Sequence, residues 1–492
     1  MDMVPGRNAT DLAEDQVISQ FQYRPELKRT LTGFGSFATS YSFISVTTGI
    51  FTMFGYVLTS SGPAGIWVWP IAVVGQLMVA LLYSDIAGRI PVSGYSYQWI
   101  NRMANTAVGW FAGWLSVAYF LLVVAAVNAG LAPVIAVIFG ISATASHLVE
   151  IGVVLIILQF VINAFSTRLA SLFNNFGVFS ELIGLVALGI LLLVIGLSHG
   201  HAISGLASHS NVKGPYLPVF LAAFLFPLYT IVGFETAANL AEETHHAHRT
   251  VPKMVTLSVL SSGLVGMFFL IAAVMAMPSL NSVLKSSTPL PFIVESNLGH
   301  AMGSVFLVVV AISIFVCGLV CMMSGGRLIY AMSRDNRFFM SQTFRRISPR
   351  FDTPLAALGL LTVVGLVVTV FSSSLAILVG TTAVMPTVTY LMTIVAYFVA
   401  WRRGYLPKSL GGFALGAWTV PVGILAVIWL LSGLLMLTVP TQFHATDVWT
   451  LGIFGVGALI YRFGFHGKMP SERLIGREDS PVGQETTIPP NQ

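Results

Sequence analysis

Glu181 is the residue of this chain whose type and position could most directly do chemistry. It lies inside an apolar run, and no Lys or Arg occurs between Arg168 and Lys213. An ionised carboxylate is costly in an apolar interior, so such a group either binds a proton or pairs with a cation. We predict that Glu181 couples a proton or a cation to the function of the chain. Direct contact with an amine, or a structural hydrogen bond to a helix hydroxyl or to the pair Asn174 and Asn175, are the alternatives.

A second candidate site is a group of small and hydroxyl-bearing residues in the middle of the apolar run 34–58. Such residues weaken a helix and leave backbone N–H and C=O groups that must face protein, water or a ligand. N–H groups at the start of a half-helix suit a carboxylate, and carbonyls at the end of one suit an ammonium group or a cation. The candidate binding residues are Ser45, Val46, Thr47, Thr48 and Gly49. The alternative is that they only kink a buried helix.

The apolar run 217–240 carries a similar interruption around Pro227. Proline cannot donate a backbone hydrogen bond, so it frees a carbonyl upstream. Aromatic side chains beside it could cover a substrate and stabilise an ammonium group with their faces, or they could be packing residues. Two breaks at matching places in two halves of a chain are typical of a transporter binding site. The candidates in this run are Phe226, Tyr229, Thr230, Ile231 and Gly233.

The composition indicates that these runs cross a membrane. The 492 residues are 55% hydrophobic and only 9% charged, with a mean hydropathy of +0.84, whereas soluble domains carry roughly 25% charged residues. We predict an all-α integral membrane protein with twelve transmembrane helices. Segments of sufficient length occur at 34–59, 66–88, 104–128, 148–165, 176–197, 216–240, 254–277, 303–331, 355–373, 376–400, 417–438 and 446–463.

The basic residues orient these spans. With the N-terminus inside, Lys213 and Lys285 are the only two of the 24 Lys and Arg that fall on the outer side. The positive-inside rule demands such an asymmetry. We therefore expect a multi-pass protein of the plasma (inner) membrane, in contact with lipid and with both termini in the cytoplasm. The positive charge belongs to the cytoplasmic face, which excludes nucleic acid as a partner.

Breaks in spans 1 and 6 divide the chain into two halves. We expect spans 1–5 (31–200) and spans 6–10 (201–403) to form two inverted repeats, with spans 11 and 12 (404–465) outside that core. Cytoplasmic tails would occupy 1–30 and 466–492. This division depends on hydropathy and on the paired breaks.

Four local motifs in this order carry a family resemblance. Span 1 contains Thr48-Gly49-Ile50-Phe51, and span 2 is followed by an acidic-Arg-Pro-Gly-Tyr junction made by Asp85, Arg89, Pro91, Gly94 and Tyr95. Span 6 ends in Gly233-Phe234-Glu235 and Ala241-Glu242-Glu243-Thr244, and span 8 ends in Arg327-Leu328-Ile329-Tyr330. With these motifs the chain resembles the amino acid–polyamine–organocation superfamily of permeases. It looks most similar to the amino acid–choline branch.

The resemblance implies a leucine-transporter-like fold, a 5+5 inverted repeat with broken helices 1 and 6, and secondary transport by alternating access. It also draws attention to two departures. Family members that bind α-amino acids usually show Gly-Ser/Thr-Gly in span 1, where this chain has Thr47-Thr48-Gly49. Proton-coupled relatives often place a lysine near position 181, and Glu181 reverses that charge. Together the departures slightly favour amine-type substrates.

Five charged residues lie near the expected cytoplasmic ends of their helices. We predict that ion pairs among them hold an inner gate, with a plain solvated face as the alternative. These residues are Asp85, Arg89, Glu235, Glu242 and Glu243. The nearby His245, His246 and His248 do not have the spacing of helical metal ligands, so we expect no metal and no cofactor.

The function that these observations favour is a secondary active transporter that works by alternating access. We expect it to move an amino acid or a small organic amine, such as γ-aminobutyrate or a choline- or ethanolamine-like compound, with H⁺ as coupling ion and Na⁺ as the alternative. A polyamine/amino-acid exchanger and a channel-like or sensor protein on the same fold are the other candidates. The chain shows no nucleophile elbow, no His-Glu-x-x-His and no phosphate loop, so we expect no enzyme.

Overall fold

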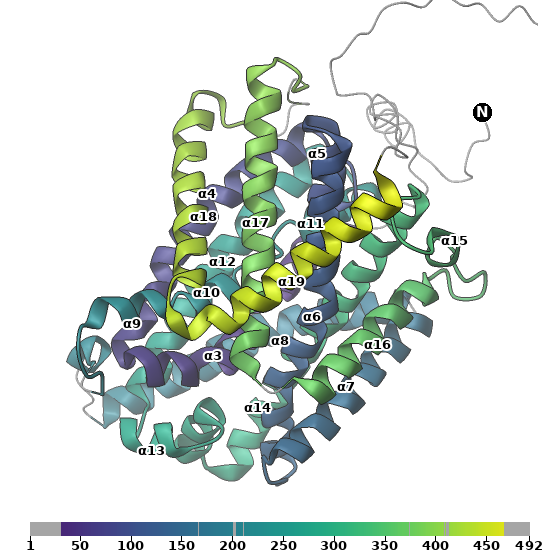
Figure 1. The fold of residues 1–492 in the computed structure, drawn as a ribbon. Coiled ribbons are helices and arrows are strands. Elements are labelled where there is room, and N and C mark those ends of the chain that lie inside the picture. The colour runs from purple at the N-terminus through teal and green to yellow at the C-terminus, as the bar shows by residue number, and fades with distance from the viewer. Residues whose placement is uncertain are drawn as a thin grey trace, which may run out of the picture.

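A computed structural model describes residues 31–466, except 166, 200–202, 210, 373, 408 and 410–412, and leaves the side chains of Tyr95, 167–172, 203–204 and Glu242 outside the description. The regular secondary structure of these residues is helical apart from one bridge between Leu31 and Thr244 (Figure 1). The predicted tails 1–30 and 467–492 lie outside the described residues.

The described helices follow one another along the chain. Their bounds are α2 Gly33–Ile44, α3 Val46–Ser61, α4 Val68–Arg89, α5 Tyr95–Met103, α6 Thr106–Ile138, α7 Ala145–Phe165, α8 Thr167–Ser198, α9 Tyr216–Ala222, α10 Leu225–Thr230, α11 Thr236–Asn239, α12 Ala247–Met275, α13 Leu280–Lys285, α14 Pro289–Arg334, α15 Ser341–Phe344, α16 Leu355–Phe371, α17 Leu375–Arg402, α18 Thr419–Thr438 and α19 His444–Ile460.

Membrane-spanning capacity follows from the length and composition of these helices. In the part of the chain that is described, ten helical segments are long and apolar enough to cross a membrane. Two shorter apolar helical segments, Tyr216–Thr230 and Leu355–Phe371, lie where the sequence predicts spans 6 and 9. The count of twelve spans stays a prediction.

Helices α2 and α3 meet at Ser45, which adopts a left-handed backbone with φ 37° and ψ 85°. A non-glycine residue is strained there, and local hydrogen bonds offset the strain. The Ser45 N–H donates to the Tyr41 carbonyl at 2.9 Å, and the Ser45 Oγ accepts from the Thr48 N–H at 3.2 Å. A small hydroxyl residue thus ends one helix and caps the next.

The chain leaves helical geometry a second time between α10 and α11. The Ile231 N–H closes α10 by donating to the Pro227 carbonyl at 2.8 Å. Gly233 then adopts φ 80°, a left-handed value that glycine reaches without a steric penalty. Its N–H is satisfied from another helix, because it donates to the Tyr390 hydroxyl of α17 at 2.8 Å.

Helix packing brings the two interruptions together. Helix α3 packs against α10, and α2 packs against α11. Helix α8 packs against α2, α12 and α14, which places Glu181 beside the first interruption. Helix α19 runs diagonally across the front of the bundle in Figure 1, where it contacts α6 and α17, and it is mostly exposed. The interruptions therefore lie in the interior, away from α19.

Candidate functional site

The two interruptions touch each other at glycines. A Cβ atom on Gly49 of α3 would overlap the side chain of Thr230 of α10. A Cβ atom on Gly233 would overlap the ring of Phe43 near the end of α2. Both overlaps lie between the first broken segment (α2 and α3) and the α10–α11 segment. The lack of a side chain at Gly49 and at Gly233 therefore allows the two broken segments to cross closely.

Glu181 approaches the first interruption from α8. Its Oε1 accepts hydrogen bonds from the Thr47 N–H at 2.9 Å and from the Ser45 hydroxyl at 3.3 Å. The Glu181 side chain is 2% exposed. Asn174, one of the partners considered for it, instead donates to the Thr39 hydroxyl at 3.3 Å. The carboxylate therefore lies at the N-terminus of α3, where the helix dipole favours negative charge.

A cavity of about 20 Å³ lies beside the second interruption. It has room for roughly one water molecule. Its walls are Phe43, Ser116, Tyr119, Phe120, Gly233, Glu235, Pro386, Thr389 and Tyr390. The Glu235 Oε2 accepts from the Tyr390 hydroxyl at 2.7 Å, and the same hydroxyl accepts from Gly233. One carboxylate and four aromatic rings are thus gathered around this small space.

Of these wall residues, the sequence singled out only Gly233 and Glu235, and Tyr119 and Tyr390 are among those that it did not indicate. Each is a tyrosine in a long apolar helix, α6 or α17, with no local motif that would single it out. Glu235 was expected among the gate residues, and the structure puts it in the cavity wall, bonded to α17. The signal for Tyr390 exists only in three dimensions, because its partners are more than 150 residues away in the chain.

The other predicted binding residues of the second interruption have different surroundings. The Phe226 ring packs on Trp69 with centroids 5.0 Å apart, and Thr230 donates to the Phe226 carbonyl at 2.8 Å. Tyr229 is 5% exposed, and its hydroxyl has no hydrogen-bond partner in the described part of the chain. Ile231 and the remaining span 1 candidate, Val46, are fully buried.

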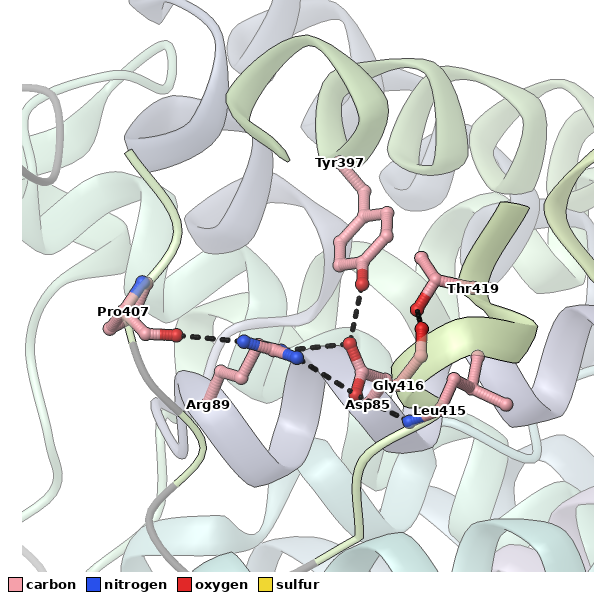
Figure 2. A network of polar contacts seen from close by, with 7 residues as sticks. All are labelled: Asp85, Arg89, Tyr397, Pro407, Leu415, Gly416 and Thr419. Atoms are coloured by element: carbon pink, nitrogen blue, oxygen red, sulfur yellow. Dashed lines mark hydrogen bonds and ion pairs between the residues drawn. The ribbon is translucent and has the colours of Figure 1, made fainter. Parts of the chain in front are cut away.

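Asp85 and Arg89 form a network that joins three elements, as Figure 2 shows. The Arg89 Nε lies 2.8 Å from the Asp85 Oδ2, and Tyr397 of α17 donates to the same oxygen at 2.5 Å. The Leu415 N–H donates to the Asp85 Oδ1 at 3.1 Å, and Arg89 donates to the Pro407 carbonyl at 3.0 Å. The network ties α4 to α17 and to the segment that precedes α18.

A separate ion pair follows the second interruption. The Arg327 Nη1 of α14 lies 2.9 Å from the Glu243 Oε1. The neighbouring backbone is paired with the start of span 1, because the Leu31 N–H donates to the Glu243 carbonyl at 2.7 Å and the His245 N–H donates to the Leu31 carbonyl at 3.0 Å. The side chain of Glu242 lies outside the described residues. Within the described chain, no group of three or more His, Cys, Asp or Glu could hold a metal ion.

A larger cavity of about 340 Å³ is bounded by α3, the end of α6, residues 284–291 and the start of α17. Its walls carry the hydroxyls of Thr52, Tyr56, Thr59 and Ser286 to Thr288, and they contain no Asp, Glu, Lys or Arg. This volume lies within the usual range for sites that hold small molecules. The predicted topology puts this cavity on the outer side of the crossing.

Comparisons with known proteins give a consistent picture. A family model described as amino acid permease matches residues 31–470. Amino-acid permease BAT1 of Arabidopsis thaliana is 26% identical over 464 residues, which cover 87% of this chain and 89% of that protein. Amino-acid permease 2 of Neurospora crassa is 23% identical over 470 residues, covering 90% and 84%.

Among solved structures, MhsT in complex with L-phenylalanine superposes with a TM-score of 0.59 at 17% identity. The match covers 84% of this chain and 100% of that chain. At this identity the likeness shows the fold. The predicted all-helical fold of the leucine-transporter type is confirmed.

Proposed function

Because this chain belongs to the amino acid permease family, we propose that it is a secondary active transporter that moves an amino acid or a small organic amine across the plasma membrane by alternating access, coupled to protons. The resemblance to the permease superfamily is confirmed at this level, and so is the expectation of a transporter in preference to an enzyme. The chain is a multi-pass membrane protein. Its place in the amino acid–choline branch stays a prediction.

The observation that carries the proposal is the carboxylate of Glu181 at the first helix interruption. It lies 2.9 Å from the Thr47 nitrogen and is 2% exposed. A buried acid beside the broken segment of span 1 can link a protonation step to the segment that a substrate would contact. We assign proton coupling to Glu181, with sodium as the alternative ion, and substrate contact to the residues predicted around Ser45–Gly49 and Phe226–Gly233.

The small cavity supports a substrate with an ammonium group. Glu235 supplies a negative charge, and the rings of Phe43, Tyr119 and Phe120 can interact with a cation through their faces. This cavity is far smaller than an amino acid. Substrate binding would therefore require the α10–α11 segment to move, and the bond between Glu235 and Tyr390 would have to break or shift.

The contacts made by the segment after span 6 suit an inner gate. Glu243 and Arg327 join this segment to α14, while Leu31 joins it to the start of span 1. We propose that these contacts keep the cytoplasmic side closed and that they break together when this side opens. The uncharged cavity of about 340 Å³ would then be the path from the outer side. This assignment adopts the predicted topology, with both termini in the cytoplasm and the repeats 31–200 and 201–403.

A polyamine/amino-acid exchanger is the second candidate, and one observation favours it. The site contains two carboxylates, Glu181 and Glu235, each beside one of the interruptions. Two negative charges can balance two ammonium groups better than one. Exchange needs amino acid on the opposite side of the membrane, whereas proton-driven uptake needs a pH gradient. Transport assays therefore distinguish them.

The test is uptake by the full chain in proteoliposomes, with pH gradient, sodium gradient and internal amino acid varied independently. We expect accumulation of an amino acid or a small amine against its gradient when the outside is acidic. Glu181→Gln should abolish the response to the pH gradient, whereas Glu150→Gln, which alters an exposed carboxylate on α7, should keep it. Accumulation that requires internal amino acid and no pH gradient would favour the exchanger. Equilibration without accumulation would indicate a channel.

A further inference from the structure

Three backbone donors in the first turn of α3 are occupied by groups of the protein itself. The Thr47 N–H donates to Glu181, the Thr48 N–H donates to the Ser45 Oγ at 3.2 Å, and the Gly49 N–H donates to the Ser45 carbonyl at 3.1 Å. Ser45 is held in place as the helix cap, whereas Glu181 belongs to another helix. The Thr47 N–H is therefore the donor whose acceptor can withdraw without unwinding α3.

Among the described residues, the surroundings of Glu181 supply hydrogen bonds but no opposite charge. Helices α2 and α3 carry no charged side chain, and the Tyr41 hydroxyl of α2 is within electrostatic reach of Glu181. The Tyr41 hydroxyl is itself buried without a hydrogen-bond partner among the described residues. The other helices packed on α8 carry His147 and Glu150 (α7), His248, Arg249 and Lys253 (α12), and Glu295, His300, Arg327 and Arg334 (α14).

None of these His, Glu, Arg and Lys side chains forms a hydrogen bond or ion pair with Glu181 in the described part of the chain, where its hydrogen-bond partners are Ser45 and Thr47. A second carboxylate brought to the N-terminus of α3 would face an uncompensated like charge, and two carboxylates cannot both stay ionised in such a site. One of them must leave or become neutral.

We propose that the carboxylate of the substrate replaces Glu181 as the acceptor of the Thr47 N–H, and that Glu181 takes up one proton as it is displaced. The inference rests on the transport function proposed above and deepens it. The hydrogen bond from Thr47 to Glu181 breaks, and one from Thr47 to the substrate forms. The proton comes from the solution on the side from which the substrate enters, and it leaves when the substrate leaves and Glu181 returns to Thr47.

This exchange separates the two substrate classes. A zwitterionic amino acid binds together with one proton, so that each transported molecule carries one net positive charge. An amine without a carboxylate leaves Glu181 on Thr47 and binds without that proton. The transported class is therefore the carboxylate-bearing one, and the same residue that couples the proton selects the substrate.

The experiment measures equilibrium binding to the purified full chain between pH 5 and pH 9. The probes are the twenty common amino acids and γ-aminobutyrate. Each is paired with the amine of the same structure that lacks only its carboxylate. For amino acids that bind, we expect the Kd to rise by about tenfold per pH unit at the alkaline end, the slope for uptake of one proton. The amino group of each probe is titrated separately, and its contribution is subtracted before the slopes of the two members of a pair are compared.

Glu181→Gln keeps a neutral acceptor for Thr47 and should remove this slope, whereas Glu150→Gln should retain it. If the Gln variant does not fold, the paired probes on the unmodified chain still decide. Equal slopes for an amino acid and its amine, or an unchanged slope in Glu181→Gln, would overturn the exchange while leaving transport intact. If no probe is bound or transported, the proposed function fails and the exchange fails with it.

Discussion

Thr230 of α10 occupies the space that a side chain on Gly49 of α3 would need. These residues lie 181 positions apart in the numbering, and each belongs to one of the two interrupted segments. The contact makes the crossing of these segments a packed interface between two helices. Movement of one segment during transport must therefore be accommodated by the other, because closely packed interiors transmit small displacements.

Gly49→Ala should impair transport strongly. The added methyl group would overlap Thr230, and overpacking of this kind costs about 1–3 kcal/mol. We expect the thermal unfolding temperature to fall and the initial uptake rate to drop by about tenfold. Gly455→Ala in α19 is the matched control, because nothing lies near the position of its added Cβ. Equal behaviour of the two variants would show that the crossing tolerates a side chain.

Tyr390→Phe should be more destabilising than Tyr229→Phe. The Tyr390 hydroxyl bonds to Glu235 and Gly233, so its removal leaves a buried N–H and a half-buried carboxylate without this partner, at a cost of about 1–3 kcal/mol. The Tyr229 hydroxyl has no partner among the described residues, so its loss removes no hydrogen bond there and should leave the free energy of unfolding unchanged or slightly higher. Thermal unfolding of the purified variants measures both. The reverse order would contradict the assigned hydrogen bonds.

Breaking the pair between Glu243 and Arg327 should loosen the cytoplasmic end of span 1. The backbone of Glu243 is bonded to Leu31, so a change at the side chain is transmitted to the segment that precedes α2. We expect Glu243→Gln to increase hydrogen exchange in 31–44, by a modest factor because a partly exposed pair contributes only about 1 kcal/mol. The double charge swap Glu243→Arg with Arg327→Glu should restore protection. A swap that behaves like the single variant would argue against the ion pair.

Arg89→Met should destabilise the protein more than Tyr397→Phe. Asp85 is completely buried, and removal of its cation leaves an uncompensated charge, at about 3–5 kcal/mol. Loss of the Tyr397 hydroxyl removes one hydrogen bond to a charged acceptor, about 2 kcal/mol. Denaturation in detergent gives the two values. Asp85→Asn in the Arg89→Met background should recover part of the loss, because it removes the unpaired charge.

Several features of this protein could be predicted from its sequence because their causes are local. The hydropathy of each run is a property of its own residues, and it sufficed for the all-helical membrane fold that the comparison with MhsT confirms. The four local motifs, including the one from Gly233 to Thr244, sufficed to predict the family. Glu181 could be singled out because an acidic residue in an apolar run is conspicuous without any partner.

The partners of these residues could not be predicted in the same way. The direction in which a side chain leaves a long helix is decided by how that helix packs on others, and no local rule gives it. Glu181 could have faced Asn174, and the structure turns it toward Thr47. Glu235 could have faced the cytoplasm, and the structure joins it to Tyr390.

The sequence by itself thus determined the class of protein, its family and the unusual acid at position 181, since composition, motif order and isolated charge are written along the chain. Only the tertiary structure decided that Glu181 occupies a donor of α3, that Gly49 and Thr230 share one space, and that Glu243 meets Arg327. Each of these relationships joins helices distant in sequence, and close packing alone brings them within hydrogen-bonding or contact distance.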